Sequence, residues 1–241
     1  MALPKNLLTI YGRNAVLEAL EEKDLKVYAL HLAKSNKRSP KLDAIITAAK
    51  KSGVEIKYHD RDKLSYISKN RKQDQGVALD IILDNFRESS DFEDLKKYRI
   101  LALDGVENPQ NLGMIIRSAA AGKIDAIIIP KRGTASLISP LTIKASVGTL
   151  FKIPIVYTNS LEQTLSAFKE TGSEIVNLSL HAKSTLFNYK IPEKTIFILG
   201  NETKGVSKKV AQLATKELII PMNRGVDSLN VAVTAGIISF M

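Results

Sequence analysis

Cysteine is absent from this 241-residue chain, and its absence removes several kinds of chemistry at once. Without thiols there are no disulfides, no thiolate metal sites and no cysteine nucleophile. Long apolar runs are also lacking, since none reaches the roughly 18 residues that a membrane-spanning helix needs. Residues 1–6 show neither the apolar segment nor the small-residue cleavage site of a secretory signal. We therefore expect a cytoplasmic protein.

Histidines and glycine-rich phosphate motifs are scarce as well. The three histidines, His31, His59 and His181, are scattered, so each is interpreted as a surface or packing residue rather than a metal ligand or base. No Gly-x-Gly-x-x-Gly follows a predicted strand, which leaves a dinucleotide-binding fold unsupported. Gly200 and Gly205 have the spacing of a phosphate loop, but the Lys-Ser/Thr pair that such a loop needs does not follow. We expect no metal site and no serine–histidine triad.

Positive charge is what the chain has in excess, with 35 Lys and Arg against 25 Asp and Glu, a net charge of +10 and a pI near 9.6. Such an excess favours a polyanionic partner, because Lys and Arg release counterions from phosphates. A general solubility charge is an equally open explanation of the total. Residues 1–83 hold 16 Lys and Arg against 10 Asp and Glu, so the N-terminal third is the more basic part.

The pattern of residues 1–83 predicts a small α/β domain. Helices are expected over 11–22, 40–51 and 61–68, and strands over 27–32, 54–58 and 76–83. The second helix has Pro40 near its first turn, where a fixed φ is tolerated. Residues 84–97 are polar and carry no sustained apolar pattern. We expect the linker between two domains there.

Residues 98–241 alternate short apolar runs with helical segments, which predicts a second α/β domain. Strands are expected over 99–103, 126–129, 153–157, 174–178, 196–199 and 218–220, and helices over 112–121, 141–147, 161–170, 208–213 and 229–240. Strands that are apolar on both faces indicate a parallel sheet covered by helices. The last helix is apolar almost all round, so we expect it in a core or a subunit contact.

Three loops at the carboxyl ends of these strands share a polar composition rich in Gly, Asn and Ser. They are residues 104–113, 200–205 and 221–230. Each alone has an ordinary explanation as a turn or a helix cap. In open α/β sheets, however, ligands bind beyond the carboxyl ends of the strands. The three together therefore predict a polar pocket.

These loops, in this order and at these spacings, resemble the three motifs of the SpoU (TrmH-type) branch of the SPOUT RNA methyltransferases. The motifs are Asn-Pro-x-Asn-x-Gly-x-x-x-Arg, then Gly-x-Glu-x-x-Gly, then Pro-Met followed by Ser-Leu-Asn. The matching residues are Asn108, Pro109, Asn111, Gly113 and Arg117; Gly200, Glu202 and Gly205; and Pro221, Met222, Ser228, Leu229 and Asn230. The resemblance covers the whole of roughly 99–241.

The resemblance extends into the N-terminal part. Residues 10–16 and 75–77 look like the small RNA-binding domain of the 23S rRNA guanosine 2′-O-methyltransferases of this family, so the domains are expected at 1–83 and 98–241 with a linker at 84–97. Lys34, Lys37, Arg38 and Lys41 form one basic cluster, and Lys69, Arg71 and Lys72 form a second. The residues predicted to bind RNA are Arg13, Lys37, Arg38, Arg71 and Lys72.

The resemblance implies a catalytic domain with a C-terminal trefoil knot, a homodimer with the last helix in its interface, and S-adenosylmethionine as cofactor. The positions that would hold the cofactor, mainly through backbone groups, are Leu199, Gly200, Ile220, Met222 and Leu229. The positions implied in catalysis are Arg117, Asn111, Glu202, Ser228 and Asn230. No metal is implied. The expected reaction is methylation of a ribose 2′-hydroxyl in structured RNA, with a guanosine of 23S rRNA as the target.

One departure from the family pattern is visible, and two other functions stay open. The family usually has Gly two residues after the Met of Pro-Met, where this chain has Arg224 followed by Gly225. This leaves the shape of the third loop open. A tRNA ribose 2′-O-methyltransferase is the alternative within the family. A non-catalytic RNA-binding factor for ribosome assembly is the alternative outside enzymes, although it would have no need for the intact polar motif residues.

Overall fold

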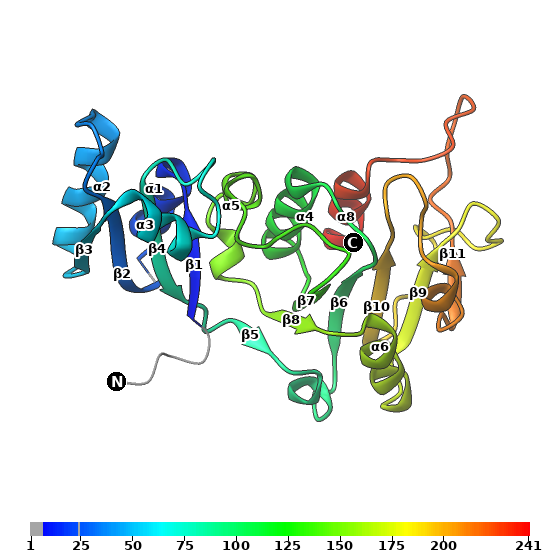
Figure 1. The fold of residues 1–241 in the computed structure, drawn as a ribbon. Coiled ribbons are helices and arrows are strands. Elements are labelled where there is room, and N and C mark those ends of the chain that lie inside the picture. Colours follow the sequence, from blue (N-terminus) through cyan, green and yellow to red (C-terminus); the bar gives the residue numbers. More distant parts are fainter. Residues whose placement is uncertain (1–6, 24) are drawn as a thin grey trace. The chain divides into compact units, whose positions relative to one another are not determined.

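The computed structural model describes residues 7–23 and 25–241, and the chain divides into two compact units (Figure 1). The first unit holds the described residues up to Asp84 together with Ser136–Phe151, and the second holds Asn85–Ala135 and Lys152–Met241. The expectation about a secretory signal rests on residues 1–6, which lie outside the described residues. Within the described ranges, no helix has both the length and the apolar character needed to cross a membrane.

A four-stranded sheet forms the base of the first unit. Its elements are β1 (Leu7–Tyr11), α1 (Arg13–Glu21), β2 (Lys26–Ala33), α2 (Pro40–Lys51), β3 (Glu55–His59), α3 (Arg61–Ser68) and β4 (Val77–Ile82). The strand order is β1-β4-β2-β3, with only β2 and β3 parallel. Side-chain caps fix the helix starts: Ser39 accepts from Leu42 N at 3.3 Å and Asp60 accepts from Lys63 N at 2.7 Å.

A segment that is distant in sequence completes this unit. It consists of α5 (Pro140–Ser146) and the short 3-10 helix η2 (Thr149–Phe151). Ser139 caps α5, and α5 packs against α1 with Thr142, Ile143 and Ser146 buried. The apolar face of α5 therefore belongs to the core of the first unit, although its sequence lies within the predicted catalytic domain.

The second unit is built on a seven-stranded parallel sheet in the order β11-β9-β10-β6-β7-β8-β5. Its strands are β5 (Phe86–Arg87), β6 (Tyr98–Leu103), β7 (Ala126–Pro130), β8 (Ile155–Thr158), β9 (Glu174–Leu178), β10 (Lys194–Leu199) and β11 (Lys216–Leu218). Its helices are the 3-10 helix η1 (Ser89–Phe92), α4 (Pro109–Ala121), α6 (Leu161–Glu170), α7 (Lys208–Ala211) and α8 (Val231–Ser239).

The strand order places a topological switch between β6 and β10. From β6 the chain continues to β7 and β8 on one side, whereas β9 and β11 lie on the other side. Helices α6 and α7 cover one face through a core that includes Ile100, Ile196 and Phe168. Helices α4 and α8 pack against each other and contact β7 and β10, respectively (Figure 1). Loops that leave β6 and β10 in such a fold meet at the place where ligands bind.

The predicted fold class, a parallel-sheet domain preceded by a small α/β domain, is confirmed. The trefoil knot stays a prediction from the resemblance. The structure differs from the expected organisation at 84–97, where β5 pairs with β8 and Phe92 is buried in the second unit's core. It also contains β1, which local patterning did not indicate. Leu7 pairs with Ile82, and this long-range partner is what makes β1 a strand.

Candidate active site

The first polar loop connects β6 to α4. The side chain of Asn108 accepts hydrogen bonds from Gln110 N at 2.8 Å and Asn111 N at 3.3 Å, so it satisfies amides that the first helical turn leaves free. Asp104, at the start of the loop, accepts from Ser207 N at 2.7 Å. The Asn-Pro of the motif is thus the beginning of a helix, and the loop is tied to the segment that follows β10.

The second polar loop, residues 200–205, folds back on itself. Asn201 and Gly205 exchange backbone hydrogen bonds of 3.0 and 2.9 Å, and Gly205 has a φ of 68°. A Cβ at Gly200 would overlap the backbone of Gly205 and Val206, so glycine is required there by close approach. The side chain of Asn201 donates to Gly105 O at 2.7 Å, which links this loop to the first.

The third polar loop joins β11 to α8. Asn230 caps α8 by accepting from Ala232 N at 2.8 Å and Val233 N at 3.4 Å. Arg224 and Gly225 have φ values of 58° and 70°, so the turn uses two successive left-handed residues. This is the position where the sequence departs from the family pattern. Arg224 adopts a conformation that glycine adopts without strain.

Asn111 connects the three loops through its side chain. Its Nδ2 donates to Glu202 Oε1 at 2.8 Å, and its Oδ1 accepts from Asn230 Nδ2 at 3.2 Å. Asn111 is only 6% exposed, so both of its polar ends are satisfied away from bulk water. Three of the five residues implied in catalysis therefore form one network, and the geometry of that network holds the three loops in place.

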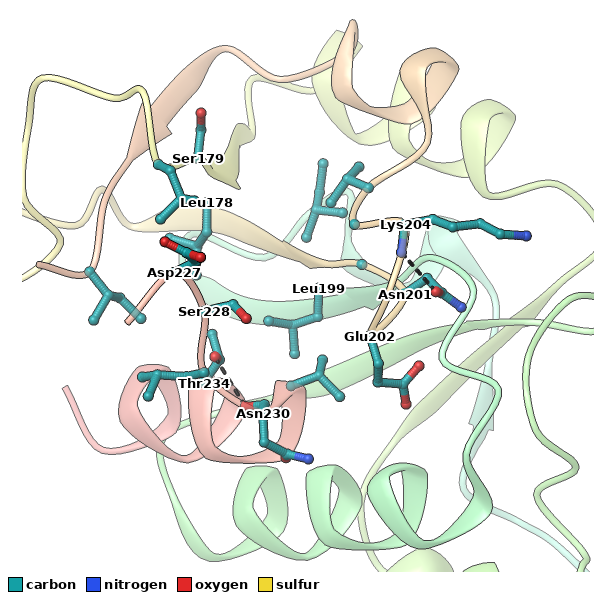
Figure 2. A pocket seen from close by; sticks show the side chains of 18 of the residues that line it. Leu178, Ser179, Leu199, Asn201, Glu202, Lys204, Asp227, Ser228, Asn230 and Thr234 are labelled. Atoms are coloured by element: carbon teal, nitrogen blue, oxygen red, sulfur yellow. Dashed lines mark hydrogen bonds between the residues drawn. The ribbon is translucent and has the colours of Figure 1, made fainter. Parts of the chain in front are cut away.

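A cavity of about 610 Å³ is lined by the second and third loops and the end of β9, and the first loop is joined to it through the hydrogen bonds of Asn111 to Glu202 and Asn230. All five predicted cofactor positions line it: Leu199, Gly200, Ile220, Met222 and Leu229. Glu202, Ser228 and Asn230 line it as well, and Figure 2 shows Glu202 on one side with Ser228 and Asn230 on the other. The combination of apolar side chains, exposed backbone and a few polar groups is typical of a small-molecule site.

Sequence reasoning missed part of the cavity wall. Leu178 and Ser179, at the end of β9, line the cavity near Asp227, and Thr234 lines it beside Asn230 (Figure 2). The strand 174–178 was predicted correctly, and the carboxyl-end rule applies to it as it does to its neighbours. The residues that follow it match none of the three motifs, so no sequence signal marks them as part of the site.

Arg117 lies apart from the other residues implied in catalysis. It is exposed on α4 and is not among the residues that line the cavity. On a helix of 3.6 residues per turn, Arg117 shares a face with Met114 and Ala121, which are also exposed. Asn111 projects from a different face of the same helix. The structure thus brings Asn111, Glu202, Ser228 and Asn230 together and leaves Arg117 outside that group.

The residues predicted to bind RNA lie in the first unit. Lys37, Arg38 and Lys72 are exposed, and Arg71 pairs with Asp62 at 2.8 Å on the surface. Arg13 differs from these, because its guanidinium is engaged within the fold. Its Nη1 donates to Ser39 Oγ at 3.0 Å and its Nε donates to Gln75 O at 3.3 Å.

Two family models match the chain. The SpoU rRNA Methylase family matches residues 98–240, and the model described as RNA 2′-O ribose methyltransferase substrate binding matches residues 9–86. YacO of Bacillus subtilis, named as a TrmH family tRNA/rRNA methyltransferase, is 32% identical over 96% of this chain and 93% of its own length. An uncharacterized tRNA/rRNA methyltransferase of Mycobacterium tuberculosis is 30% identical over 95% of this chain and 72% of its own.

Solved structures share the fold over nearly the whole chain. The SpoU methyltransferase AviRb of Streptomyces viridochromogenes, crystallised in complex with AdoMet, superposes with a TM-score of 0.69 at 22% identity, covering 97% of this chain and 88% of its own. An AdoMet-bound rRNA methyltransferase of Sinorhizobium meliloti gives a TM-score of 0.68 at 24% identity, covering 96% of this chain and 85% of its own. At these identities the likeness concerns the fold.

Proposed function

The chain belongs to the SpoU family and is an RNA methyltransferase, and on that basis we propose that it uses S-adenosylmethionine to methylate a ribose 2′-hydroxyl, with a guanosine of 23S rRNA as the target. The observation that carries the proposal is a cavity at the carboxyl ends of β9 and β10 that the second and third motif loops line, with Asn111 of the first loop hydrogen bonded to Glu202 and Asn230 of its wall. A protein that only bound RNA would not need a network in which the buried Asn111 joins Glu202 and Asn230.

The cavity fits S-adenosylmethionine in size and in the chemistry of its walls. Its volume lies within the roughly 300–1,000 Å³ usual for small-molecule sites. Leu199, Ile220 and Leu229 offer apolar surface for an adenine ring, and Gly200, where the loop folds closely onto Gly205, adds to the cavity wall. The cofactor would supply an activated methyl group. The described residues contain no cluster of three or more His, Asp or Glu side chains placed to hold a metal ion.

The protein's own residues must then align a 2′-hydroxyl and accommodate the loss of its proton. The network around Asn111 orients Glu202 and Asn230 at the cavity before substrate arrives, which lowers the cost of arranging these groups for the reaction. Arg117 is a poor base, because a guanidinium carries no lone pair available to accept a proton at neutral pH. We assign it to gripping a phosphate or the hydroxyl and stabilising the developing alkoxide.

A homodimer completes the proposal. Three large apolar residues of α8 and the neighbouring α4 are exposed to solvent. Val233 of α8 is 52% exposed, the C-cap residue Phe240 is 63% exposed, and Met114 of α4 is 41% exposed. Val233 and Phe240 are seven residues apart, which places them on one face, and α4 packs against α8. A second copy of the chain would cover this apolar surface and bring Arg117, which shares a face of α4 with Met114, into a shared interface. This agrees with the expectation that the last helix takes part in a subunit contact.

The choice of rRNA over tRNA rests on the extent of the structural matches. A structure concerned with 2′-OH methylation of C/U34 on tRNA covers 58% of this chain, and the tRNA-modifying TrmH/SpoU enzyme of A. aeolicus covers 59%. The Sinorhizobium rRNA methyltransferase covers 96%. A match of that extent must include the first unit, which matches the substrate-binding model. We place the reaction in the cytoplasm, where ribosomal RNA is found.

Mapping 2′-O-methyl groups in RNA from cells with and without the gene tests the proposal. We expect one guanosine of 23S rRNA to lose its methyl group when the gene is removed, and to regain it when the gene is restored. Loss at a tRNA position would favour the alternative within the family. If every ribose methylation persists while ribosome assembly is impaired, the protein would instead be a non-catalytic assembly factor.

A further inference from the structure

Two basic loops of the first unit are joined by hydrogen bonds that cross about forty residues of sequence. Loop A, residues 34–38, follows β2, and loop B, residues 69–76, precedes β4. Asn36 of loop A donates from Nδ2 to Gly76 O at 2.7 Å. A Cβ at Gly76 would overlap the Asn36 side chain, so this contact also requires glycine. The two loops therefore form one surface.

Arg13 clamps the two loops together. Its Nη2 lies 3.5 Å from Asn36 Oδ1 of loop A, and its Nε donates to Gln75 O of loop B, while its Nη1 donates to Ser39 Oγ, the residue that follows loop A and caps α2. Its own backbone N donates to Gln75 Oε1 at 3.0 Å, and Gln75 has a left-handed φ of 51°. A guanidinium presents five donors in a rigid fork, and here that fork is directed at groups of the protein. Arg13 is a positioning residue.

The cations on this surface are available to an external anion. In the part of the chain that the structure describes, Lys34, Lys37, Arg38, Lys69 and Lys72 are exposed and make no ion pair. Loop B is braced from within instead, where Arg61 pairs with the buried Asp74 at 2.5 Å. Holding five like charges on two linked loops costs stability, which indicates a surface shaped for phosphates rather than for solubility alone.

An aromatic side chain borders this surface. Tyr66 on α3 is 86% exposed, and it lies one turn after Asp62, the residue that pairs with Arg71 of loop B. An exposed tyrosine beside phosphate-binding cations is the arrangement that RNA-binding proteins use to stack an unpaired base. A fully paired helix offers no free base face, so the partner indicated is an RNA loop or bulge.

We propose that the Arg13 clamp joins loops A and B into one RNA-binding surface on which Tyr66 stacks against an unpaired base. The assignment rests on the proposed function and deepens it, because it names the RNA feature that the first unit recognises. It also changes the expected role of Arg13 from contacting RNA to shaping the loops that do. Its failure is separable from failure of the proposed function, because RNA binding is measured without cofactor or methyl transfer.

The test measures binding of the full chain to a labelled RNA hairpin with an unpaired loop and to a blunt duplex of equal length. We expect Tyr66→Ala to weaken hairpin binding about tenfold, and Tyr66→Phe to leave it unchanged. Duplex binding should be the same for all three proteins. The matched control is Tyr58→Ala, a 56% exposed tyrosine on β3, which should bind the hairpin as the wild type does. Equal hairpin affinity for Tyr66→Ala and wild type would overturn the stacking assignment.

The clamp is tested by two variants that leave the net charge of the protein unchanged. Asn36→Ala removes no charge, yet it should weaken binding of both RNAs several-fold because the loops are released. Arg13→Lys keeps the charge and loses the fork, so it should weaken both RNAs in the same way. Thermal melting identifies any variant that fails to fold, and Arg13→Lys is the milder of the two. Wild-type binding by a folded Arg13→Lys protein would contradict the clamp.

Discussion

The cavity of the second unit and the basic surface of the first unit are both made of loops that side chains hold together. The residues that link and line the two sites differ in chemical character. Around the cavity, the link is the buried amide of Asn111, and the walls are apolar side chains and backbone. On the basic surface, the link is the guanidinium of Arg13, and the outward groups are exposed cations. The first arrangement suits a small ligand held with a fixed geometry. The second suits a long polyanion.

This difference predicts a division of labour between the units, and substitutions in each should therefore produce different kinds of defect. Changes around the cavity should alter turnover and cofactor binding with little dependence on salt. Changes on the basic surface should alter RNA affinity and its salt dependence. The largest effect is expected at Arg117, which belongs to neither group of loops.

Replacing Arg117 by alanine should lower turnover by about 10²–10³-fold, the usual effect of removing one donor that stabilises a developing oxyanion. Cofactor affinity measured by calorimetry should stay within about twofold of wild type, because Arg117 does not line the cavity. Arg117→Lys retains the positive charge but not the planar fork, so it should recover only part of the lost rate. Near-normal turnover in the alanine variant would remove Arg117 from the mechanism.

Asn111→Asp should be the next largest change, because it places a second carboxylate against Glu202 at the distance of the present 2.8 Å hydrogen bond. Repulsion should spread the loops and weaken cofactor binding by about tenfold. The matched control is Asn177→Asp, since Asn177 donates to Glu217 in the same unit at 3.5 Å. Both variants should lower the melting temperature. A loss of cofactor affinity that is equal in the two would show that Asn111 has no special role.

The salt dependence of ligand affinity distinguishes the basic surface from the cavity. The logarithm of the RNA association constant should fall linearly with the logarithm of the salt concentration. Substituting Lys37, Arg38 and Lys72 by glutamine should flatten that slope by about 0.7–0.9 for each phosphate that the protein no longer neutralises. Cofactor affinity should change little over the same range. A salt slope that these substitutions leave unchanged would place the RNA-binding cations elsewhere on the chain.

The stability of the two units should also depend on pH in opposite directions, since acid should destabilise the first unit and alkali the second. Burial and the neighbouring His31 lower the pKa of His59 below its ordinary 6.5, and hydrogen bonds from His31 and Thr9 lower the pKa of Asp80 despite its burial. Both groups stabilise the first unit at neutral pH, and that stability is lost as pH falls below about 6.5 and further below about 4. In the second unit, burial and a hydrogen bond to Glu174 raise the pKa of Tyr189 to about 12.

The stability that Tyr189 supplies is complete below pH 10 and is lost as pH rises from there toward 12. Hydrogen exchange, measured by mass spectrometry on individual peptides, reports on the stability of each unit separately. Relative to the intrinsic exchange rate at each pH, mild acid should lower protection in the strands of the first unit, and alkali should lower it around β9. The effects should be small, because each comes from one or two groups. Acid-induced exchange confined to the second unit would contradict the assignment.

Local sequence signals predicted helices well where caps are present. The helices at 40–51, 61–68 and 161–170 begin after Ser39, Asp60 and Ser160, whose side chains accept from the first turn. The strands β1 and β5 were not predicted, because each is short and is stabilised by a partner distant in sequence. The place of α5 in the first unit is likewise a long-range property. The apolar face of α5 does not show which core it joins.

The same distinction applies to the site. The motifs identified the three loops, because residue type and spacing are visible in the sequence, and the family resemblance implied the five cofactor positions, which line the cavity. They did not show that Asn111 links Glu202 and Asn230, since those bonds span 91 and 119 residues. Nor did they show that Arg13 is hydrogen bonded within the fold. A basic residue in a basic region gives the same sequence signal whether it binds phosphate or shapes a loop.

The identity of the modified nucleoside tests the central claim most directly. Purified protein would be incubated with ribosomal RNA from cells lacking the gene and with S-adenosylmethionine carrying a labelled methyl group, and the RNA would then be digested to nucleosides and separated. We predict that the label appears in 2′-O-methylguanosine, that Arg117→Ala reduces it by the factor given above, and that a chelator has no effect. Label in a base-methylated nucleoside, or none in any RNA, would contradict the account.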